Sequence, residues 1–474
     1  MISGDVPNLI GGEEAAAASG DWFDKLRPAD GEHLRRAARS GGADVDRAVA
    51  AARSAQPAWA GRTPVERGDI VREIALALRE RREELSEAVA AETGKPPELA
   101  LGETDAAVEM GLFVAGEGRR SYGRTMPAST AHRTVLTVRA PVGVAALITS
   151  FNTPLPNVAW KAFPSLLCGN GSVLKPSEHT PASAHLFAQV AHESGLPPGV
   201  LNVVQGLGAE AGAALVEHAG VDLVSFTGSA STGRWINERA GARLAKICLE
   251  LGGKNALVVC DDADLELAAR WAVASAFSNA GQRCAAASRV VVFDGVYDAF
   301  RDRFVQAARE TPAQPVISEE SIERILAGVS EAVAGGATVL TGGERLDRPG
   351  WHLAATILEG VTPEAPLSCT ELFGPVATLY RVGGLAEAIA LVNGSPYGLT
   401  AAIHTASLHR AMRFAEQAQA GVVVVNGGTH GSEPHMGFGG VKASGTGWKE
   451  AGVEALDVYS DVRYINLIAD PALA

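Results

Sequence analysis

The feature that most constrains this chain is an alternation of short apolar segments with helical stretches, which occurs twice along its length. The first series contains the apolar segments Val144–Ile148, Ser172–Lys175, Leu201–Val204, Leu223–Phe226 and Lys246–Leu249. A second series follows Asn255, with strands expected near Val290–Val292, Thr338–Leu340, Ala377–Tyr380 and Val422–Val425. Such alternation is typical of parallel sheets covered by helices on both faces, so the sequence predicts an α/β fold with two doubly wound parallel-sheet domains.

The segments outside the two series have their own patterns. Apolar residues recur at helical spacing from Asp44 to Glu92, which predicts two or three amphipathic helices that stop near Gly94 and Pro96. Residues 133–139 and 456–468 instead alternate at a strand period. Each is too short for a stable sheet alone, so we expect them to pair with one another and to extend a sheet across a subunit boundary. An edge ribbon within one chain is the alternative.

Composition excludes several classes of protein. A chain of 474 residues with 47% hydrophobic and 20% charged residues is long enough for two large domains. Its longest uncharged apolar stretches, such as residues 140–148, fall short of the roughly 20 residues of a membrane span. A net charge of −13 without a basic patch argues against a nucleic-acid partner. Residues 1–5 lack the pattern of a secretory signal, so a cytoplasmic location is expected.

The cysteines argue for one reactive thiol. The chain has an odd number of widely spaced cysteines, namely Cys168, Cys248, Cys260, Cys284 and Cys369. No Cys-x-x-Cys pair occurs, so neither disulfides nor a metal site is expected. Cys284 differs by its context, because it ends the string Gly281-Gln282-Arg283-Cys284 and follows a second glycine-marked turn that contains Glu250. A thiol and a carboxylate in such turns suit a covalent catalyst.

A neutral thiol is a poor nucleophile, so something must favour its anion. The alanines at 285–287 predict that Cys284 lies at the start of a helix, where free N–H groups and the helix dipole would stabilise a thiolate. A buried, inert cysteine is the alternative for an isolated residue of this kind.

These strings resemble the NAD(P)-dependent aldehyde dehydrogenase superfamily over nearly the whole chain. The resemblance implies that Cys284 attacks an aldehyde to give a thiohemiacetal and then a thioester, and that Glu250 activates the water that hydrolyses the thioester. Asn152, in Ser150-Phe151-Asn152, resembles the family's oxyanion asparagine, which acts together with the backbone N–H of Cys284. A strand-end glutamate and a turn asparagine are the structural alternatives.

The resemblance also implies where the cofactor lies. Lys175 and Glu178 would contact the adenosine ribose, and Glu371 and Phe373 the nicotinamide ribose and ring. The diphosphate of the cofactor would lie at the turn that contains Gly228 and Ser229. A strand runs into a helix there, and free N–H groups can hold a diphosphate. A carboxylate at the ribose repels a 2′-phosphate, so NAD is expected as cofactor and NADP is the less favoured alternative.

The substrate is a small aldehyde, and its class is less constrained. Phe151, Trp160 and Phe438 are expected at the substrate pocket, which favours an aromatic aldehyde. Arg283 can bind a remote carboxylate, which favours a semialdehyde, as does some similarity to the branch that oxidises 2-oxoglutarate semialdehyde. A structural salt bridge is the alternative for Arg283. The chain departs from the family pattern at Ser150-Phe151 in place of Pro-Trp, at Arg27 in place of Asn, at Gly437 in place of Pro, and in a shortened connector at 311–315.

The predicted organisation follows from these assignments. An NAD-binding domain is expected at residues 1–118 and 141–252, a catalytic domain at 253–426, and a small β oligomerisation element at 119–140 and 455–474. The element predicts a homodimer or a homotetramer. Two other functions are weighed: a CoA-acylating semialdehyde dehydrogenase, which needs no water-activating Glu250, and a catalytically silent protein that keeps the fold.

Overall fold

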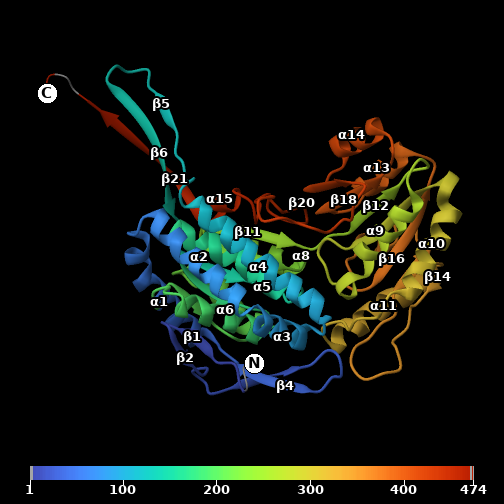
Figure 1. The fold of residues 1–474 in the computed structure, drawn as a ribbon, viewed down its shortest axis with the longest axis horizontal. Helices are drawn as coiled ribbons and strands as arrows, with labels where there is room; N and C mark the ends of the chain where they lie inside the picture. Colours follow the sequence, from blue (N-terminus) through green and yellow to red (C-terminus); the bar gives the residue numbers. More distant parts are fainter. Residues whose placement is uncertain (1–3, 470–471, 473–474) are drawn as a thin grey trace.

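Two seven-stranded sheets, each covered by helices, form the body of the molecule (Figure 1). The structure is a computed structural model that describes residues 4–469 and 472. The first residues of the expected NAD-binding domain (1–3) and the last of the expected oligomerisation element (470–471 and 473–474) lie outside the described residues. The α/β fold with two largely parallel sheets is the fold class that the sequence predicts.

The first sheet has the strand order β11-β10-β7-β8-β9-β1-β2. Its strands are β1 (Asn8–Ile10), β2 (Glu13–Ala15), β7 (Val144–Ile148), β8 (Gly171–Lys175), β9 (Leu201–Val203), β10 (Leu223–Gly228) and β11 (Lys246–Leu251). The five predicted strands of the first series are all present and run parallel, whereas β1 and β2 add an antiparallel edge that the sequence pattern did not reveal.

Helices cover both faces of this sheet. Within β7, Ala145 and Leu147 face one helical layer, and Val144 and Ala146 face the other. The first layer comprises α2 (Pro64–Glu80), α3 (Arg82–Thr93), α4 (Pro97–Glu117), α5 (Pro154–Cys168) and α6 (Pro181–Glu193). The second comprises α1 (Gly42–Ala60), α7 (Ala213–Glu217), preceded by a π-helical turn (Gly208–Gly212), and α8 (Ala230–Gly241). The helical run predicted from Asp44 is therefore three helices, the last of which ends at Gly94 in the left-handed conformation.

The second sheet has the strand order β14-β15-β16-β13-β12-β18-β19. Its strands are β12 (Asn255–Val259), β13 (Ala287–Phe293), β14 (Thr338–Thr341), β15 (Thr356–Glu359), β16 (Val376–Val382), β18 (Thr400–His404) and β19 (Val422–Val425). All pairs are parallel except β14 with β15. The four predicted strands are present, and β12, β15 and β18 complete the sheet between and beside them.

Helices cover the second sheet in the same manner. They are α9 (Leu265–Phe277), α10 (Tyr297–Glu310), α11 (Glu319–Ala334), α12 (Pro366–Cys369), α13 (Leu385–Asn393) and α14 (Leu408–Gln417), with 3-10 turns at Ser278–Gly281 and Asp294–Val296. The α9 and α10 layer packs on one face, and α13 with α14 packs on the other. Two two-stranded antiparallel sheets complete the body, β3 (Trp22–Leu26) with β4 (His33–Ala38) and β17 (Tyr397–Gly398) with β20 (Val441–Lys442).

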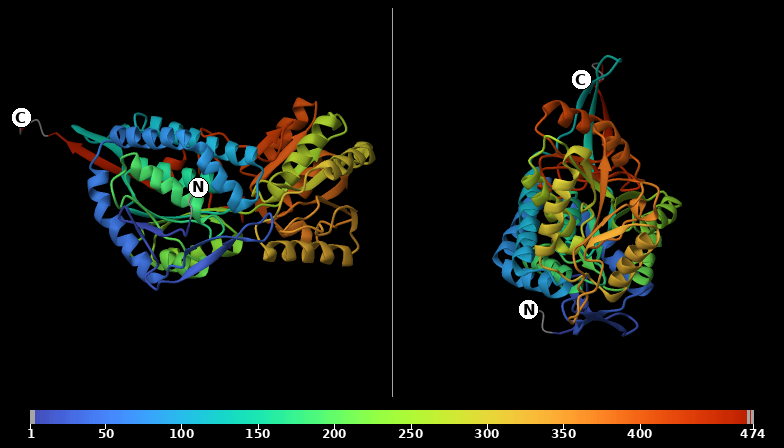
Figure 2. Two further views of the ribbon diagram at one scale, coloured as in Figure 1. Left: turned by 60° about the horizontal axis from the view of Figure 1, so that its bottom comes forward. Right: turned by 90° about the vertical axis from the view of Figure 1, so that its right-hand side faces the viewer.

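A three-stranded ribbon projects from the body (Figures 1 and 2). It consists of β5 (Thr125–Pro127), β6 (Arg133–Pro141) and β21 (Ser460–Ile468) in antiparallel pairing. The predicted pairing of residues 133–139 with the C-terminal segment is thus confirmed within one chain. The predicted start at residue 456 is wrong, because residues 455–459 form helix α15 (Ala455–Tyr459), whose Leu456, Val458 and Tyr459 are buried against the first helical layer.

Among residues 4–469 and 472, no helix combines the length and the apolar character needed to cross a bilayer.

Candidate active site

The first sheet contributes its carboxyl edge to the site. Asn152 follows β7, Ser229 follows β10, and Lys175 ends β8. Glu250 is the second-last residue of β11. The chain runs from β7 outward through β8 and β9, then returns to add β10 and β11 on the other side of β7. In open parallel sheets, such a reversal of strand order leaves a crevice at the carboxyl ends, where ligands bind. The sequence-predicted residues of this sheet therefore share one edge.

The second sheet contributes the opposite edge. Cys284 precedes β13 and Glu371 precedes β16, so both lie where these strands begin. The prediction that Cys284 starts a helix is wrong, because residues 284–286 form a turn that leads directly into β13. The side-chain amide of Asn255 donates hydrogen bonds to the carbonyl groups of Cys284 (2.7 Å) and Ala286 (3.0 Å), which holds this turn without a helix.

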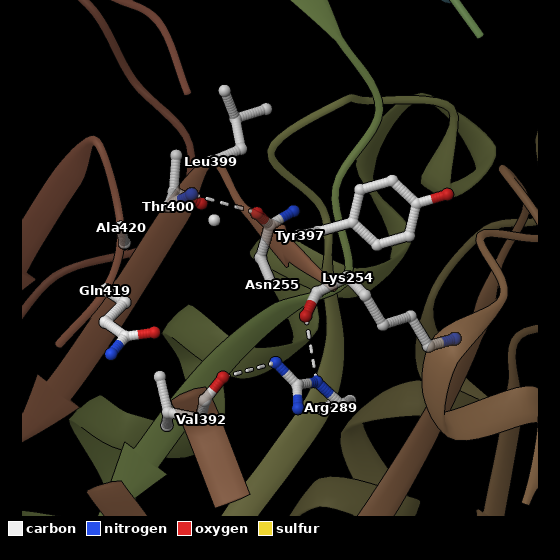
Figure 3. A pocket seen from close by; sticks show the side chains of 10 residues that line it. Lys254, Asn255, Arg289, Val392, Tyr397, Leu399, Thr400, Gln419 and Ala420 are labelled. Atoms are coloured by element: carbon white, nitrogen blue, oxygen red, sulfur yellow. Dashed lines mark hydrogen bonds between the residues drawn. The ribbon is translucent and has the colours of Figure 1, made fainter. Parts of the chain in front are cut away.

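A small pocket behind the turn shows how Asn255 is itself held (Figure 3). The Asn255 Oδ1 atom accepts a hydrogen bond of 3.0 Å from the backbone N–H of Thr400 on β18. Beside it, the buried guanidinium of Arg289 donates to the carbonyl groups of Lys254 (2.8 Å) and Val392 (3.2 Å). These contacts connect the turn of Cys284 to β12, β13 and β18. The residues that line the pocket therefore hold this turn in place.

The thiol of Cys284 lies in an environment that opposes ionisation. Burial, together with the charges of Glu371 and Glu250, raises the pKa of Cys284 to about 12, whereas Arg283 and the backbone N–H of Ala285 act in the opposite direction. Both carboxyl groups therefore lie close enough to the sulfur to affect its charge. The helix dipole expected from the sequence does not contribute, since no helix begins at this residue.

The loop before Cys284 is held in a strained conformation. Asn279 and Ala280 have φ values of 57° and 53°, in the left-handed region that non-glycine residues rarely occupy. Gly281 follows at φ 68°, and a Cβ there would lie 2.2 Å from the carbonyl oxygen of Gly374. Phe373 on the facing loop is also left-handed, at φ 55°. Strain of this kind persists only where the surroundings over-determine the backbone, and it is concentrated at functional sites.

The side chain of Asn152 is oriented by a residue that the motifs did not indicate. Asn157, one turn into α5, donates its amide N–H to the Oδ1 atom of Asn152 at 3.3 Å. The oxygen of the Asn152 amide is thereby engaged, and its NH₂ group remains the end that can donate. Both asparagines are buried. A periodicity or motif search could not find Asn157, because its position in α5 carries no pattern of its own.

Glu250 is a buried carboxyl group that forms no ion pair within the described residues, although the charges of Lys161 and Lys449 act to lower its pKa. Neither of its oxygens makes a well-aligned hydrogen bond within the described chain, although the backbone N–H of Gly440 faces the group. Burial, followed by the charge of Glu450, raises the pKa of Glu250 well above its usual range. Gly439 closes over it, since a Cβ at Gly439 would lie 2.5 Å from the Oε1 atom. A proton acceptor at neutral pH requires a carboxyl pKa raised in this direction.

A buried ion pair lies beneath Glu250. The ammonium of Lys161 contacts both oxygens of Glu450 at 2.7 and 2.8 Å, and Ser225 donates to the same carboxylate at 2.6 Å. Tyr459 in turn donates to Ser225 at 3.0 Å. The sequence does not reveal this ion pair, because Lys161 and Glu450 are 289 residues apart and no periodic pattern relates them.

The predicted diphosphate site has the form that the sequence suggests. Ser229 caps α8, and its hydroxyl accepts from the backbone N–H of Thr232 at 3.2 Å. Ser231 and Thr232 add two exposed hydroxyls to the first turn, and the buried hydroxyl of Thr227 has no partner in the described chain. Gly228 ends β10 directly before the cap. These donors at a helix N-terminus fit a diphosphate group.

Of the predicted ribose residues, Lys175 and Glu178 lie at the end of β8, and Glu371 lies on the facing sheet, before β16. Lys175 and Glu178 contact each other at 3.3 Å at the end of β8. Glu371 accepts a hydrogen bond of 3.0 Å from the backbone N–H of Gly253, and burial raises its pKa to about 7. A Cβ at Gly252 would lie 1.9 Å from Glu371, so the glycine pair after Glu250 allows this close approach. These hydroxyl-binding groups, with the diphosphate site between them, fit a dinucleotide.

The four predicted substrate residues fall into two groups. Trp160 and Phe438 pack against each other, with ring centroids 5.4 Å apart, in the same apolar cluster as Cys284. Phe151 instead packs edge-on against Phe373 at 5.7 Å, on the side of the predicted cofactor residues. The side chains of Arg283 and His430 lie close together, and Arg283 also donates to Ser278 at 3.1 Å.

The half-buried His430 is a further residue that the sequence did not single out. Burial lowers its pKa to about 4, and the neighbouring charge of Arg283 contributes. Its Nδ1 atom has no hydrogen-bond partner in the part of the chain that the structure describes. The adjacent Thr429 donates to the carbonyl of Ala285 at 2.6 Å, which fixes this loop beside the nucleophile.

Comparisons with known proteins agree with this architecture. A sequence profile described as the aldehyde dehydrogenase family matches residues 15–465. The chain is 35% identical to the α-ketoglutaric semialdehyde dehydrogenase of Bacillus subtilis, with 97% of each chain covered, and 36% identical to the NADP+ succinate-semialdehyde dehydrogenase of Escherichia coli, with 96% of each covered. The crystal structure of an NAD-dependent aldehyde dehydrogenase from Sinorhizobium meliloti superposes with a TM-score of 0.96 at 34% identity, covering 99% of this chain and 96% of that one.

Proposed function

The chain belongs to the aldehyde dehydrogenase family, and we propose that it oxidises an aldehyde to a carboxylic acid with NAD through a thioester on Cys284. The observation that carries this proposal is the meeting of two sheet edges, which brings a half-buried thiol, an orientated amide and an unpaired carboxyl group together. Neither edge alone holds the groups that acyl chemistry requires.

Cys284 and Asn152 act in the first step. The sulfur of Cys284 bonds to the aldehyde carbon and loses its proton, while the carbonyl oxygen takes up the negative charge. The NH₂ group of Asn152, left free by the contact of its oxygen with Asn157, donates to that oxyanion. Because the pKa of Cys284 is raised, the attacking thiolate is a minor species that forms by loss of the thiol proton to solvent, so the carboxylate of Glu250 stays free for the second step.

A bound NAD supplies the acceptor for the hydride of the aldehyde carbon. Ser229 and the first turn of α8 would hold its diphosphate, and Lys175, Glu178 and Glu371 its ribose hydroxyls. The carboxylate of Glu178 disfavours a 2′-phosphate, so NAD is proposed as the preferred cofactor and NADP as the weaker one.

Glu250 acts in the second step. Its carboxylate accepts a proton from water, the water oxygen attacks the thioester carbon, and the sulfur of Cys284 departs with release of the acid. The raised pKa of Glu250 gives the carboxylate the basicity for this transfer. A CoA-acylating enzyme, the competing function, would not need this residue.

Two substrate classes fit the residues beside the nucleophile. Arg283 places a guanidinium directly before Cys284 and favours a semialdehyde with a remote carboxylate. The relatives from B. subtilis and E. coli are both named for semialdehydes, which supports the same choice. The aromatic pair of Trp160 and Phe438 favours an aromatic aldehyde instead.

The projecting ribbon supports a homodimer or a homotetramer. Several of its apolar side chains are exposed, with Tyr464 at 64% and Ile468 at 73%. Pairing with a second copy would remove this surface from water. Light scattering tests the assembly, and a monomer at micromolar concentration contradicts it.

The function is tested with a panel of semialdehydes, aliphatic aldehydes and aromatic aldehydes, each assayed with NAD and with NADP. We expect NADH formation, an acyl adduct on Cys284 detected by mass spectrometry, and loss of both in Cys284→Ala. Undiminished NADH production by this variant contradicts the nucleophile, and acyl-CoA formation when CoA is added contradicts the hydrolytic step. Preference for uncharged aldehydes excludes the Arg283 clamp.

A further inference from the structure

The loop between α3 and α4 contains a buried lysine that the chemistry above does not use. Lys95 follows the left-handed Gly94, and its side chain is only 2% exposed. Its ammonium contacts the Oε1 atom of Glu103 on α4 and donates to the backbone carbonyl of Asn152. The lysine therefore joins the first helical layer to the residue that is proposed to stabilise the oxyanion.

The same carbonyl receives a second donor from the other edge of the site. Asn279, in the strained loop before Cys284, donates its side-chain amide to the carbonyl of Asn152 at 3.0 Å and to that of Gln282 at 3.2 Å. One backbone oxygen is thus held by groups from both sheets. Its position fixes how the loop of Asn152 lies against the loop of the nucleophile.

The shortened connector completes this arrangement. Gln282 donates to the carbonyl of Pro315 at 3.4 Å and accepts from the backbone N–H of Ile317 at 2.9 Å. Pro315 packs on Gly94 so closely that a Cβ at Gly94 would lie 2.3 Å from its ring. The contacts form a closed ring of residues around the site: Gly94, Lys95, Asn152, Asn279, Gln282 and Pro315.

We expect Lys95 to affect the backbone geometry at Asn152 more than the free energy of unfolding. A buried charge is costly, and an ion pair with good geometry roughly offsets that cost without adding much net stability. Glu103 provides the opposite charge, and its Oε2 atom has no partner in the described chain. A second hydrogen of the ammonium is donated to the carbonyl of Asn152, where it orients a backbone rather than filling a core.

We propose that Lys95 is a positioning residue, which holds the backbone of Asn152 so that its amide meets the oxygen of a substrate bound to Cys284. This inference rests on the proposed function. Displacement of such a donor by about 1 Å is expected to lower turnover while leaving ground-state binding largely intact, because the oxyanion exists only after attack.

Two matched double variants test the inference. Lys95→Met/Glu103→Leu removes both buried charges, so no unpaired ion is left, and Lys95→Gln/Glu103→Leu differs from it only by returning an N–H donor. The first is expected to lose about 10- to 100-fold in kcat, with KM for aldehyde and NAD within about threefold and an unchanged rate of Cys284 alkylation. The second is expected to recover part of the lost kcat. Thr104→Val, which removes a buried hydroxyl next to Glu103 on α4 that bonds only the carbonyl of Ala100, is the control for general disturbance.

The outcomes separate the two proposals. An unchanged kcat in the first variant, equal losses in both double variants, or a parallel fall in alkylation rate would each overturn the positioning role. A separate result bears on the proposed function: it is overturned if the wild-type protein forms no NADH with any aldehyde of the panel. If either double variant fails to fold, as judged by circular dichroism, Lys95 holds the fold rather than the site, and the inference is overturned.

Discussion

The two sheet edges that meet at the site hold their residues in different ways. On the first sheet, Asn152, Ser229 and Glu250 follow regular parallel strands, and their positions derive from strand register. On the second sheet, Cys284 and Phe373 lie in loops with left-handed residues, held by side chains such as Asn255. The first edge is built by local pattern, whereas the second depends on contacts between distant parts of the chain.

This difference separates the nucleophile from the groups that assist it. The residues of the first edge lie where any open parallel sheet offers a crevice. The nucleophile sits in a loop whose backbone is strained and closely packed, because a Cβ at Gly281 would clash with Gly374. A rigid loop of this kind keeps a reacting atom in place, and small errors in that placement are costly in rate.

The largest effect is expected for Glu250→Gln. Because the amide cannot accept a proton, hydrolysis of the thioester should slow by about 10²- to 10⁴-fold, while the first NADH per active site still forms in a burst. The raised pKa of Glu250 favours its neutral form, so wild-type kcat should rise with pH through that pKa and the variant should show no such rise. Stopped-flow absorbance of NADH measures both phases, and a variant without a burst contradicts the assignment.

Asn152→Ala should cost somewhat less. Loss of one oxyanion donor typically lowers turnover by about 10²- to 10³-fold, and here the burst itself should slow because the donor acts in the first step. Asn157→Leu is the matched comparison, since it frees the Asn152 amide to rotate and should give a smaller loss. Single-turnover NADH formation is the measurement, and equal rates in both variants and wild type would contradict the orientation argument.

The second edge is tested by the ionisation of its thiol. With a pKa raised to about 12 by burial, Cys284 stays protonated over the usual range, and the thiolate fraction rises tenfold for each unit of pH. Alkylation by iodoacetamide without cofactor should therefore rise about 100-fold between about pH 8 and pH 10, whereas a free cysteine would level off near about pH 8.5. Cys284→Ser provides the background from the other cysteines, and a plateau below about pH 9 contradicts the prediction.

The smallest effect is expected for Gln282→Leu. The substitution removes the contacts of the connector with the loop of Cys284 but leaves the thiol in place. A loss of about 10-fold in kcat is expected from a modest shift of the nucleophile. Steady-state kinetics with a thermal-unfolding control measures it, and wild-type kcat at unchanged stability would show that the connector does not position the loop.

The same contrast explains what the sequence could predict. Five strands of the first sheet follow from apolar segments alone, because buried parallel strands have near-continuous apolar sequences. The helix expected after Cys284 failed because Asn255, 29 residues away, satisfies the carbonyl groups of that turn. Local propensity favours a helix for an alanine run, and a single long-range contact outweighs it. Asn157, His430 and the Lys161–Glu450 pair were missed because their partners are set by the tertiary fold.

The buried pair of Lys161 and Glu450 also affects how the molecule is completed during synthesis. Lys161 is made early and lies at zero exposure, yet its counter-charge is 289 residues further along the chain. Until the ribosome has produced that segment, the ammonium cannot be withdrawn from water without a large cost. A product truncated before Glu450 is therefore expected to keep the surroundings of this lysine open to water.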